Sequence, residues 1–272
     1  MNELILFFAN LSNPQKLIWI LSCLLIFWVL EGLYPLRKVQ YNKWEHALLN
    51  FVFLGFTIII NVLFGIITVG VFSWLEESKF GLLNWFVFPT WVELIISILI
   101  LDFIAQYVVH FLLHKISFMW RFHMVHHSDT DLDVTSGTRH HPGDFIIREF
   151  FALIAVVIAG LPFAYYIIYR LITIFCTYFS HANIRLPLWL DKGISMLFIS
   201  PNMHKFHHHF ERPWTDSNFG NIFSIWDRFF GTFVYEDTSK IVYGLDVLKD
   251  KDSNDIFYQL NLPFNKKIKT DY

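Results

Sequence analysis

The longest run of uncharged residues is the feature that most constrains the fold. Residues 47–75 contain no Asp, Glu, Lys or Arg over 29 positions. As an α-helix at about 1.5 Å per residue, this run measures roughly 43 Å, whereas the hydrocarbon core of a bilayer is about 30 Å thick. The run therefore predicts a membrane-spanning helix that tilts, bends at a glycine or projects beyond the bilayer.

Three further apolar segments predict additional membrane helices. Residues 17–30 carry no charge, and the Met-Asn-Glu start is not basic, so we interpret this segment as a retained span rather than a cleaved signal peptide. Residues 91–114 form a third span. Residues 150–180, with Arg170 as their single charge inside the run, are broken at Pro162 and predict a helical hairpin that either crosses the bilayer twice or is re-entrant.

The composition agrees with a membrane protein and excludes other classes. Hydrophobic residues make up 55% of the 272 positions and charged residues only 16%, which is typical of a polytopic membrane protein. A net charge of -2 gives no indication of nucleic-acid binding. Neither Cys23 nor Cys176 belongs to a CxxC motif, so we expect neither a thiolate metal site nor a disulfide framework. The predicted fold is an all-α, polytopic integral membrane bundle with a histidine-rich cap.

The basic residues predict the orientation, because positively charged loops stay in the cytoplasm. The loop after the first span carries three, the loop near Lys79 carries one beside two acids, and the segment after the third span carries four. The N-terminus is then external, whereas the histidines and the C-terminus face the cytoplasm. The basic residues behind this prediction are Arg37, Lys38, Lys43, Lys115, Arg121, Arg139 and Arg148.

Three histidine groups predict a metal centre. His110 and His114 are four positions apart, and the two HxxHH motifs each place their histidines at i, i+3 and i+4, so each group occupies one helical face. Neutral imidazole suits iron, zinc, copper and nickel. Such a set can hold two ions with mostly nitrogen ligands. Asp102 and Gln106 continue the first face upstream and are candidates for orienting the imidazoles. The two HxxHH motifs supply His123, His126, His127, His204, His207 and His208.

Several polar residues near the histidines are predicted to have structural roles. On a helix, His209 lies about 140° from His204 and points away from the other ligands. His46 stands alone at the start of a span, and Asp144 is interpreted as a helix cap after a Pro-Gly turn. Asp227 is interpreted as an ion-pair partner of Arg228.

Three other functions need the same residue types in different patterns. A zinc hydrolase takes about three protein ligands, and the sequence has no HExxH motif. A metal transporter places its ligands near the bilayer midplane, whereas these histidines cluster at span ends and in loops. A haem cytochrome needs paired histidines on facing spans. The hydrolase and the transporter remain the alternatives to an oxidoreductase.

The histidine motifs and the segments between them resemble the membrane fatty acid hydroxylase and sterol desaturase superfamily. The resemblance covers roughly residues 90–235 and rests on HMVHHSDTDLDVTSGTRHHPGD, FSHANIRLP, SPNMHKFHH and DSNFGNIFSIWDRFFGTF. It implies a non-haem centre of two iron ions that uses O2. The ligands it implies are His110, His114, His123, His126, His127, His204, His207 and His208, together with His141 and His181.

The resemblance also implies the reaction and the partners. The expected activity is hydroxylation, or desaturation, of a sterol, fatty acyl chain, ether lipid or carotenoid taken from the bilayer. The sequence has no GxGxxG or CxxCH motif, so electrons are expected from a separate protein, cytochrome b5-like or ferredoxin-type. We divide the chain into N-terminal transmembrane helices (1–90), the di-iron catalytic domain (91–235) and a cytoplasmic tail (236–272). The oligomeric state has no sequence signal.

Overall fold

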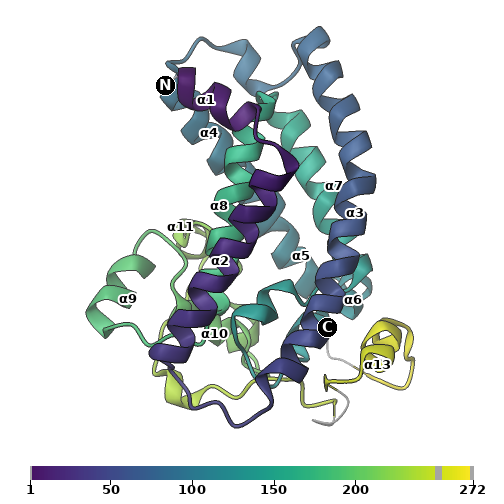
Figure 1. The fold of residues 1–272 in the computed structure, drawn as a ribbon, viewed down its shortest axis with the longest axis vertical. Helices are drawn as coiled ribbons and strands as arrows, with labels where there is room; N and C mark the ends of the chain where they lie inside the picture. Colours follow the sequence, from purple (N-terminus) through teal and green to yellow (C-terminus); the bar gives the residue numbers. More distant parts are fainter. Residues whose placement is uncertain (1, 249–252, 270–272) are drawn as a thin grey trace.

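The computed structural model describes residues 2–248 and 253–269, and this part of the chain consists of helices and loops. Extended segments within it form three isolated β-bridges and no named strand. Long helices run along the long axis of the molecule, and short helices gather at its lower end (Figure 1). The predicted all-α membrane bundle is confirmed.

Local sequence signals set the ends of the first helices. After α1 (Asn2–Ala9), Ser12 and Gln15 form a reciprocal capping box that starts α2 (Asn13–Leu33). The side chain of Asn42 accepts hydrogen bonds from two backbone N–H groups of the first turn of α3 (Lys43–Ser78). That helix is 36 residues long and ends where Lys79 takes a left-handed conformation.

The third predicted span contains a change of helix type. It follows the short 3₁₀ turn η1 (Leu82–Trp85) and comprises α4 (Thr90–Asp102), a π-helical turn η2 (Phe103–Val108) and α5 (Val109–Lys115). A π-helix bonds each residue to the fifth along, so it breaks the four-residue stripe on which we expected Asp102 and the histidines of α5 to lie.

The predicted helical hairpin is present. It is formed by α7 (Pro142–Ala159) and α8 (Phe163–His181), and Gly160 closes α7 with a φ of +66°. A Cβ atom at Gly160 would lie 2.2 Å from the carbonyl oxygen of Phe80, so this turn requires glycine. Both helices thereby point their lower ends at the same region of the molecule.

The lower end is assembled from short helices of distant parts of the chain. The elements nearest the C-terminus pack against α6 (Ser117–His127), where Leu262 is buried in a cluster with Trp120 and Met124. Gln259 accepts a hydrogen bond from Ser128. The elements of the lower end are α6 (Ser117–His127), η3 (Val134–Thr138), α9 (Leu188–Ser195), α10 (Pro201–His207), η4 (Trp214–Asp216), α11 (Ile225–Phe229), η5 (Thr238–Lys240), α13 (Ile256–Asn261) and η6 (Leu262–Phe264).

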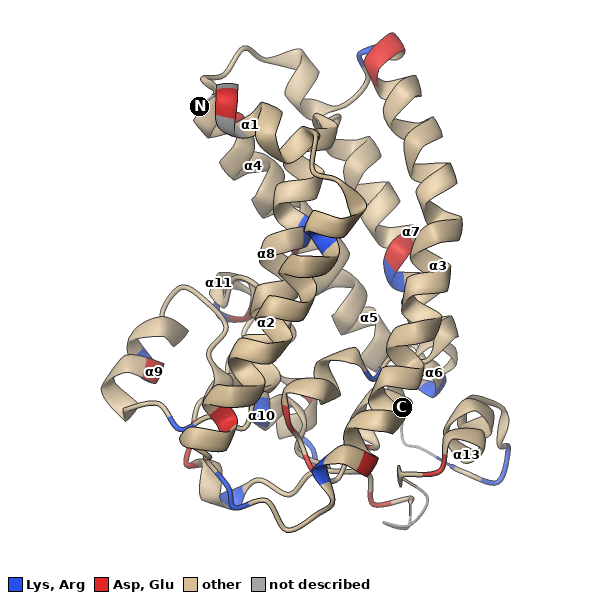
Figure 2. Ribbon diagram, in the orientation of Figure 1, with Lys and Arg blue, Asp and Glu red and all other residues tan. Residues whose placement is uncertain are grey.

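Within the described residues, four helices are long and apolar enough to cross a membrane: Asn13–Leu33, Lys43–Trp85, Thr90–Lys115 and Phe163–His181. Large apolar side chains stay exposed along their outer faces, including Leu25 of α2 and Ile66 of α3. Charged residues gather at the lower end and at the upper tips of α1 and α3, with few between (Figure 2). An apolar band between two charged ends identifies an integral membrane protein.

Candidate metal centre

Five histidines from three helices converge at the lower end of the bundle. Their ligand atoms all lie within 4.8 Å of one another, and all five side chains are buried. His110 Nε2 lies 3.1 Å from His123 Nε2, and His114 Nε2 lies 3.2 Å from His127 Nε2. We call this set the five-histidine cluster; its members are His110, His114, His123, His127 and His207.

A second cluster lies beside the first. Its four histidines meet the same 4.8 Å limit and are also buried. His181 Nε2 lies 3.0 Å from His204 Nε2 and 3.3 Å from His126 Nε2. The rings of His127 and His208 are stacked at 4.7 Å across the boundary between the clusters. The members of this four-histidine cluster are His126, His181, His204 and His208.

Each HxxHH motif serves both clusters. Along α6, His123 and His127 face the five-histidine cluster, whereas His126 faces the other. Along the second motif, His207 faces the first cluster, whereas His204 and His208 face the second. The i, i+3, i+4 spacing therefore places each helix between two neighbouring sites.

The nitrogen positions fit metal coordination. With metal–nitrogen bonds of about 2.0–2.1 Å, two ligands on one ion lie about 2.9 Å apart at right angles and about 3.4 Å apart at the tetrahedral angle. The Nε2 separations of 3.0–3.3 Å fall in this range. Among the described residues, the buried His207 Nε2 has no hydrogen-bond partner, although its Nδ1 donates to the Ser217 carbonyl. An ion in each cluster would satisfy these atoms.

Hydrogen bonds on the other ring nitrogen orient the ligands. His110 Nδ1 donates to the Phe219 carbonyl at 2.9 Å, and His181 Nδ1 donates to the Thr177 carbonyl at 2.8 Å. His123 Nδ1 faces Asp144 Oδ1 at 3.2 Å. Such partners fix the tautomer and leave Nε2 to face the cluster.

Burial keeps the imidazoles of the two clusters neutral, and the neutral form is the one that binds metal. It lowers the pKa of His123 to about 4, against the opposing effect of Asp144. It also holds the pKa of His126, His127, His204, His207 and His208 well below the usual range, and neighbouring imidazoles lower each one further. At pH 7 the lone pairs of these side chains are therefore available.

Asp102 and Gln106 do not contact the imidazoles, contrary to our expectation. The Asp102 carboxylate accepts hydrogen bonds from the backbone N–H groups of Ile222 and Phe223 and from the Trp226 indole. It thereby holds the loop whose Phe219 carbonyl orients His110. Gln106 donates to the Tyr169 hydroxyl and lines a cavity. The π-helical turn, which follows Asp102 and contains Gln106, accounts for the difference.

Asp227 holds the same loop from its other side. Its carboxylate accepts hydrogen bonds from the N–H groups of Phe219 and Gly220 and from the Thr232 hydroxyl. Arg228 instead donates to the Ser195 carbonyl. In place of the expected ion pair, Asp227 therefore contacts the loop backbone and Arg228 contacts the C-terminal end of α9.

His141 requires a correction, because the structure places it in neither cluster. Its Nδ1 accepts a hydrogen bond from Gly143 N–H at the start of α7, and its Nε2 donates to the Leu260 carbonyl. Both ring nitrogens are therefore engaged in helix capping and in anchoring the C-terminal segment. The other nine predicted ligands all lie in the two clusters.

Two histidines that we expected outside the centre do lie outside both clusters. His209 Nδ1 accepts a hydrogen bond from Val242 N–H. His46 is buried, and its ring nitrogens face the carboxylates of Asp129 and Asp133 at 2.8 and 3.1 Å. His46 thus joins α3 to the loop after α6.

Asp144 is the residue near the centre whose role sequence reasoning missed. His141, rather than Asp144, caps α7. The Asp144 carboxylate instead faces His123 at 3.2 Å, His140 at 2.7 Å and Arg148 at 3.2 Å. Asp144 lies one helical turn before Arg148, and this spacing could have predicted an ion pair between the two side chains. Asp144, His123 and His140 also form a third group with metal-ligand spacing.

Asp144→Asn is expected to weaken metal binding about 10–100-fold while leaving the helices intact. The amide cannot hold the His123 Nδ1 proton as a carboxylate does, so the ring loses its fixed orientation. Metal titration of the purified variant checks this, with Asp237→Asn, at an exposed turn outside the centre, as the control. Equal affinity for the two variants would contradict the assigned role.

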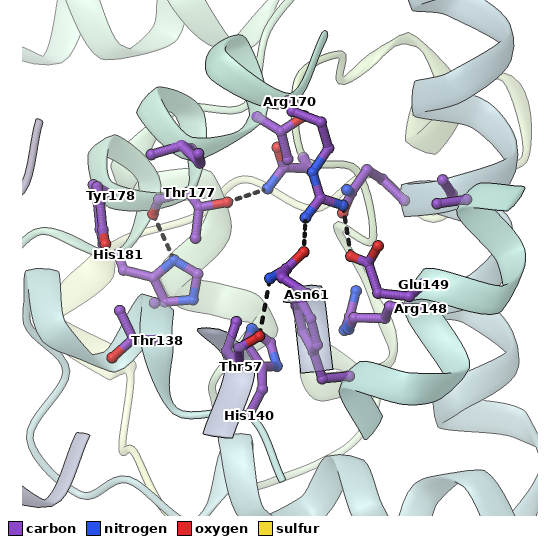
Figure 3. A pocket seen from close by; sticks show the side chains of 18 of the residues that line it. Thr57, Asn61, Thr138, His140, Arg148, Glu149, Arg170, Thr177, Tyr178 and His181 are labelled. Atoms are coloured by element: carbon purple, nitrogen blue, oxygen red, sulfur yellow. Dashed lines mark hydrogen bonds and ion pairs between the residues drawn. The ribbon is translucent and has the colours of Figure 1, made fainter. Parts of the chain in front are cut away.

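A cavity lined by histidines of both clusters extends between the membrane helices. The empty space in the cavity and in the open solvent at its mouth together measures about 1200 Å³. Its walls reach from Ile20 of α2 and Ile58 of α3 to His110 of the first cluster and His204 of the second. Figure 3 shows His181 and His140 among the side chains that line this space.

The sequence comparisons agree with this geometry. The profile of the fatty acid hydroxylase family matches residues 94–232, just over half of the chain. Ornithine lipid hydroxylase OlsE of Rhizobium tropici is 27% identical over 145 residues, covering 53% of this chain and 43% of that protein. Human (Homo sapiens) alkylglycerol monooxygenase is 27% identical over 176 residues, covering 64% of this chain and 37% of that protein.

Alkylglycerol monooxygenase of Xenopus tropicalis is 31% identical over 146 residues, which covers 52% of this chain and 30% of that protein. The chain thus spans less than half the length of these curated relatives. No solved structure matches the chain.

Proposed function

Because the chain belongs to the fatty acid hydroxylase family, we propose that it is a membrane monooxygenase that hydroxylates a C–H bond of a lipid at a centre of two iron ions. The observation that supports this most strongly is the cavity that joins the membrane helices to both histidine clusters. The names of its relatives, a lipid hydroxylase and alkylglycerol monooxygenases, support a lipid substrate.

The five-histidine cluster would hold one ion and the four-histidine cluster the other. When bound, two irons supply the reduction of O2 to an oxidant strong enough to attack an unactivated C–H bond. Nine nitrogen ligands are more than one zinc ion of a hydrolase takes.

The protein's own residues would position the lipid and its target carbon. Apolar side chains such as Leu54, Ile58 and Ile174 line the cavity, so a hydrocarbon chain can enter between the helices and displace water. The backbone carbonyls and Asp144 hold the imidazoles in place, which keeps the centre at a fixed distance from the bound chain. Desaturation uses the same arrangement with a different placement of the substrate.

The orientation of the chain follows from the same proposal. With the clusters at the cytoplasmic end, a soluble electron donor, cytochrome b5-like or ferredoxin-type, can dock on the charged lower face. A reporter fused after Tyr272 should then read cytoplasmic, and one inserted near Lys79 should read external, because basic loops stay inside. An external C-terminal reporter would contradict this orientation and the access of a cytoplasmic donor.

Lipid mass spectrometry tests the function. Cells that express the protein are expected to accumulate a lipid with one added oxygen atom, and cells that express His204→Ala are not. A lipid lacking two hydrogens would indicate desaturation at the same centre. Identical lipid profiles, at equal protein levels and with iron supplied, would contradict the proposed oxidation of lipids.

A further inference from the structure

A polar cluster interrupts the apolar cavity within the membrane helices. Arg170 of α8 donates to Glu149 of α7 at 2.5 Å and to the side-chain oxygen of Asn61 of α3 at 2.9 Å. Figure 3 shows these three side chains converging from three helices. All three line the cavity that reaches the histidines. Ionisable residues inside a membrane segment are expensive to bury and usually mark functional positions.

The cluster keeps unused hydrogen-bonding capacity that faces the cavity. Arg170 has five N–H donors: two are used by Glu149 and Asn61, and the Tyr166 side chain is a third partner, which leaves N–H groups for a ligand. Its side chain is 28% exposed, whereas that of Glu149 is only 5% exposed. Nearby on the cavity wall, the buried Thr57 hydroxyl has no hydrogen-bond partner among the described residues. A purely structural tie between helices would leave fewer polar atoms unpaired.

The cluster is also close enough to the metal centre to orient a bound chain. Glu149 follows Arg148, whose guanidinium lies 3.5 Å from His123 Nδ1. Along α8, eleven positions separate Arg170 from His181, which is roughly 16 Å along the helix axis. A lipid held at Arg170 therefore places its neighbouring carbons along the path to both histidine clusters.

The geometry points to a binding site at Asn61, Glu149 and Arg170 for a neutral oxygen-bearing group of the lipid, such as a hydroxyl or an amide. The site accepts an oxygen at the free N–H groups of Arg170. A neutral group fits because Glu149 already balances Arg170, and Asp144 balances Arg148. A carboxylate or an ammonium would remain uncompensated in a low-dielectric site. Its role in substrate selection rests on the proposed lipid oxidation.

A matched series of twelve-carbon probes tests the site. Dodecan-1-ol and dodecanamide are expected to bind the purified, detergent-solubilised protein at least about tenfold more tightly than dodecane, because a hydrogen bond to a charged group is a strong one. Dodecanoate and dodecylammonium are expected to bind more weakly than the alcohol. Ligand-dependent shifts of the melting temperature give the five affinities. Tightest binding of dodecanoate would overturn the neutral-group assignment.

The double variant Glu149→Leu/Arg170→Met removes both charges together, so no lone charge stays buried. It is expected to keep its metal content and to lose the preference for dodecan-1-ol over dodecane. The control is Thr173→Val, because Thr173 lines the same cavity but its hydroxyl donates to the Tyr169 carbonyl. This control should retain the preference.

If the double variant and Thr173→Val both still prefer dodecan-1-ol over dodecane, the inference is overturned. These readouts are independent of turnover. A protein that shows the preference but oxidises no lipid would therefore contradict the proposed function alone.

Discussion

His208→Ala is expected to lose most of the metal of the four-histidine cluster and to reduce product formation at least about 100-fold, whereas His209→Ala retains both. His208 Nε2 lies 3.2 Å from His204 Nε2 and 3.3 Å from His181 Nε2, so its removal opens a coordination position. His209 has a different task, since its Nδ1 accepts a hydrogen bond from Val242 N–H. This expected loss of activity exceeds the roughly 10–100-fold loss that is typical when a residue that only orients a metal ligand is replaced.

Metal analysis and lipid product, measured on the same preparations, check this pair. The two histidines are adjacent in sequence, so the comparison controls for expression, membrane insertion and local composition. If His209→Ala proves as damaging as His208→Ala, the division of this motif between the clusters is wrong. Equal retention of metal in both variants would remove His208 from the ligand set.

The second large effect is expected at His46, which we interpreted as a residue without a role in the centre. His46→Ala should destabilise the protein by about 3–5 kcal/mol, because it removes the imidazole that two buried carboxylates face. Burial alone would raise the pKa of Asp129, but His46 and Arg139 hold it well below its usual range. The carboxylates of Asp129 and Asp133 are therefore both ionised at pH 7.

Thermal unfolding of the purified variant measures this effect. The melting temperature is expected to fall by more than about 6 °C, at roughly 2–4 °C per kcal/mol for a chain of this size. Both His209→Ala and His46→Ala remove an imidazole from outside the metal clusters, so His209→Ala serves as the control. A melting temperature for His46→Ala equal to that of the control would show that the Asp129 and Asp133 carboxylates do not need His46.

The parts of the fold that periodicity determines could be predicted from the sequence. A 29-residue uncharged run allows little besides a long membrane helix, and Pro162 between two apolar segments predicts the hairpin. The i, i+3, i+4 spacing fixes which histidines share a helical face. These are local properties of the chain, which one helix expresses without its neighbours. His209 lies outside both clusters as expected, but for another reason, because α10 ends at His207 and His209 forms a β-bridge with Tyr243.

Contacts between distant segments could not be predicted. The division of each HxxHH motif between two clusters depends on how α5, α6, α8 and α10 meet. The role of Asp144 depends on α6 lying beside α7, and that of Asp102 depends on a loop about 120 residues later in the chain. His141 was assigned by resemblance, yet its engagement with Leu260 required the C-terminal segment to fold back onto the cap.

The iron content of the purified protein tests the central claim most directly. Protein made in iron-supplied cells, or reconstituted with ferrous iron without oxygen, is expected to hold close to two irons per chain, because the structure offers two separate histidine clusters. Its absorption spectrum should lack the Soret band of haem. Zinc can replace iron during overexpression, so both metals are measured. One metal ion or fewer per chain after reconstitution would contradict a centre built from both clusters.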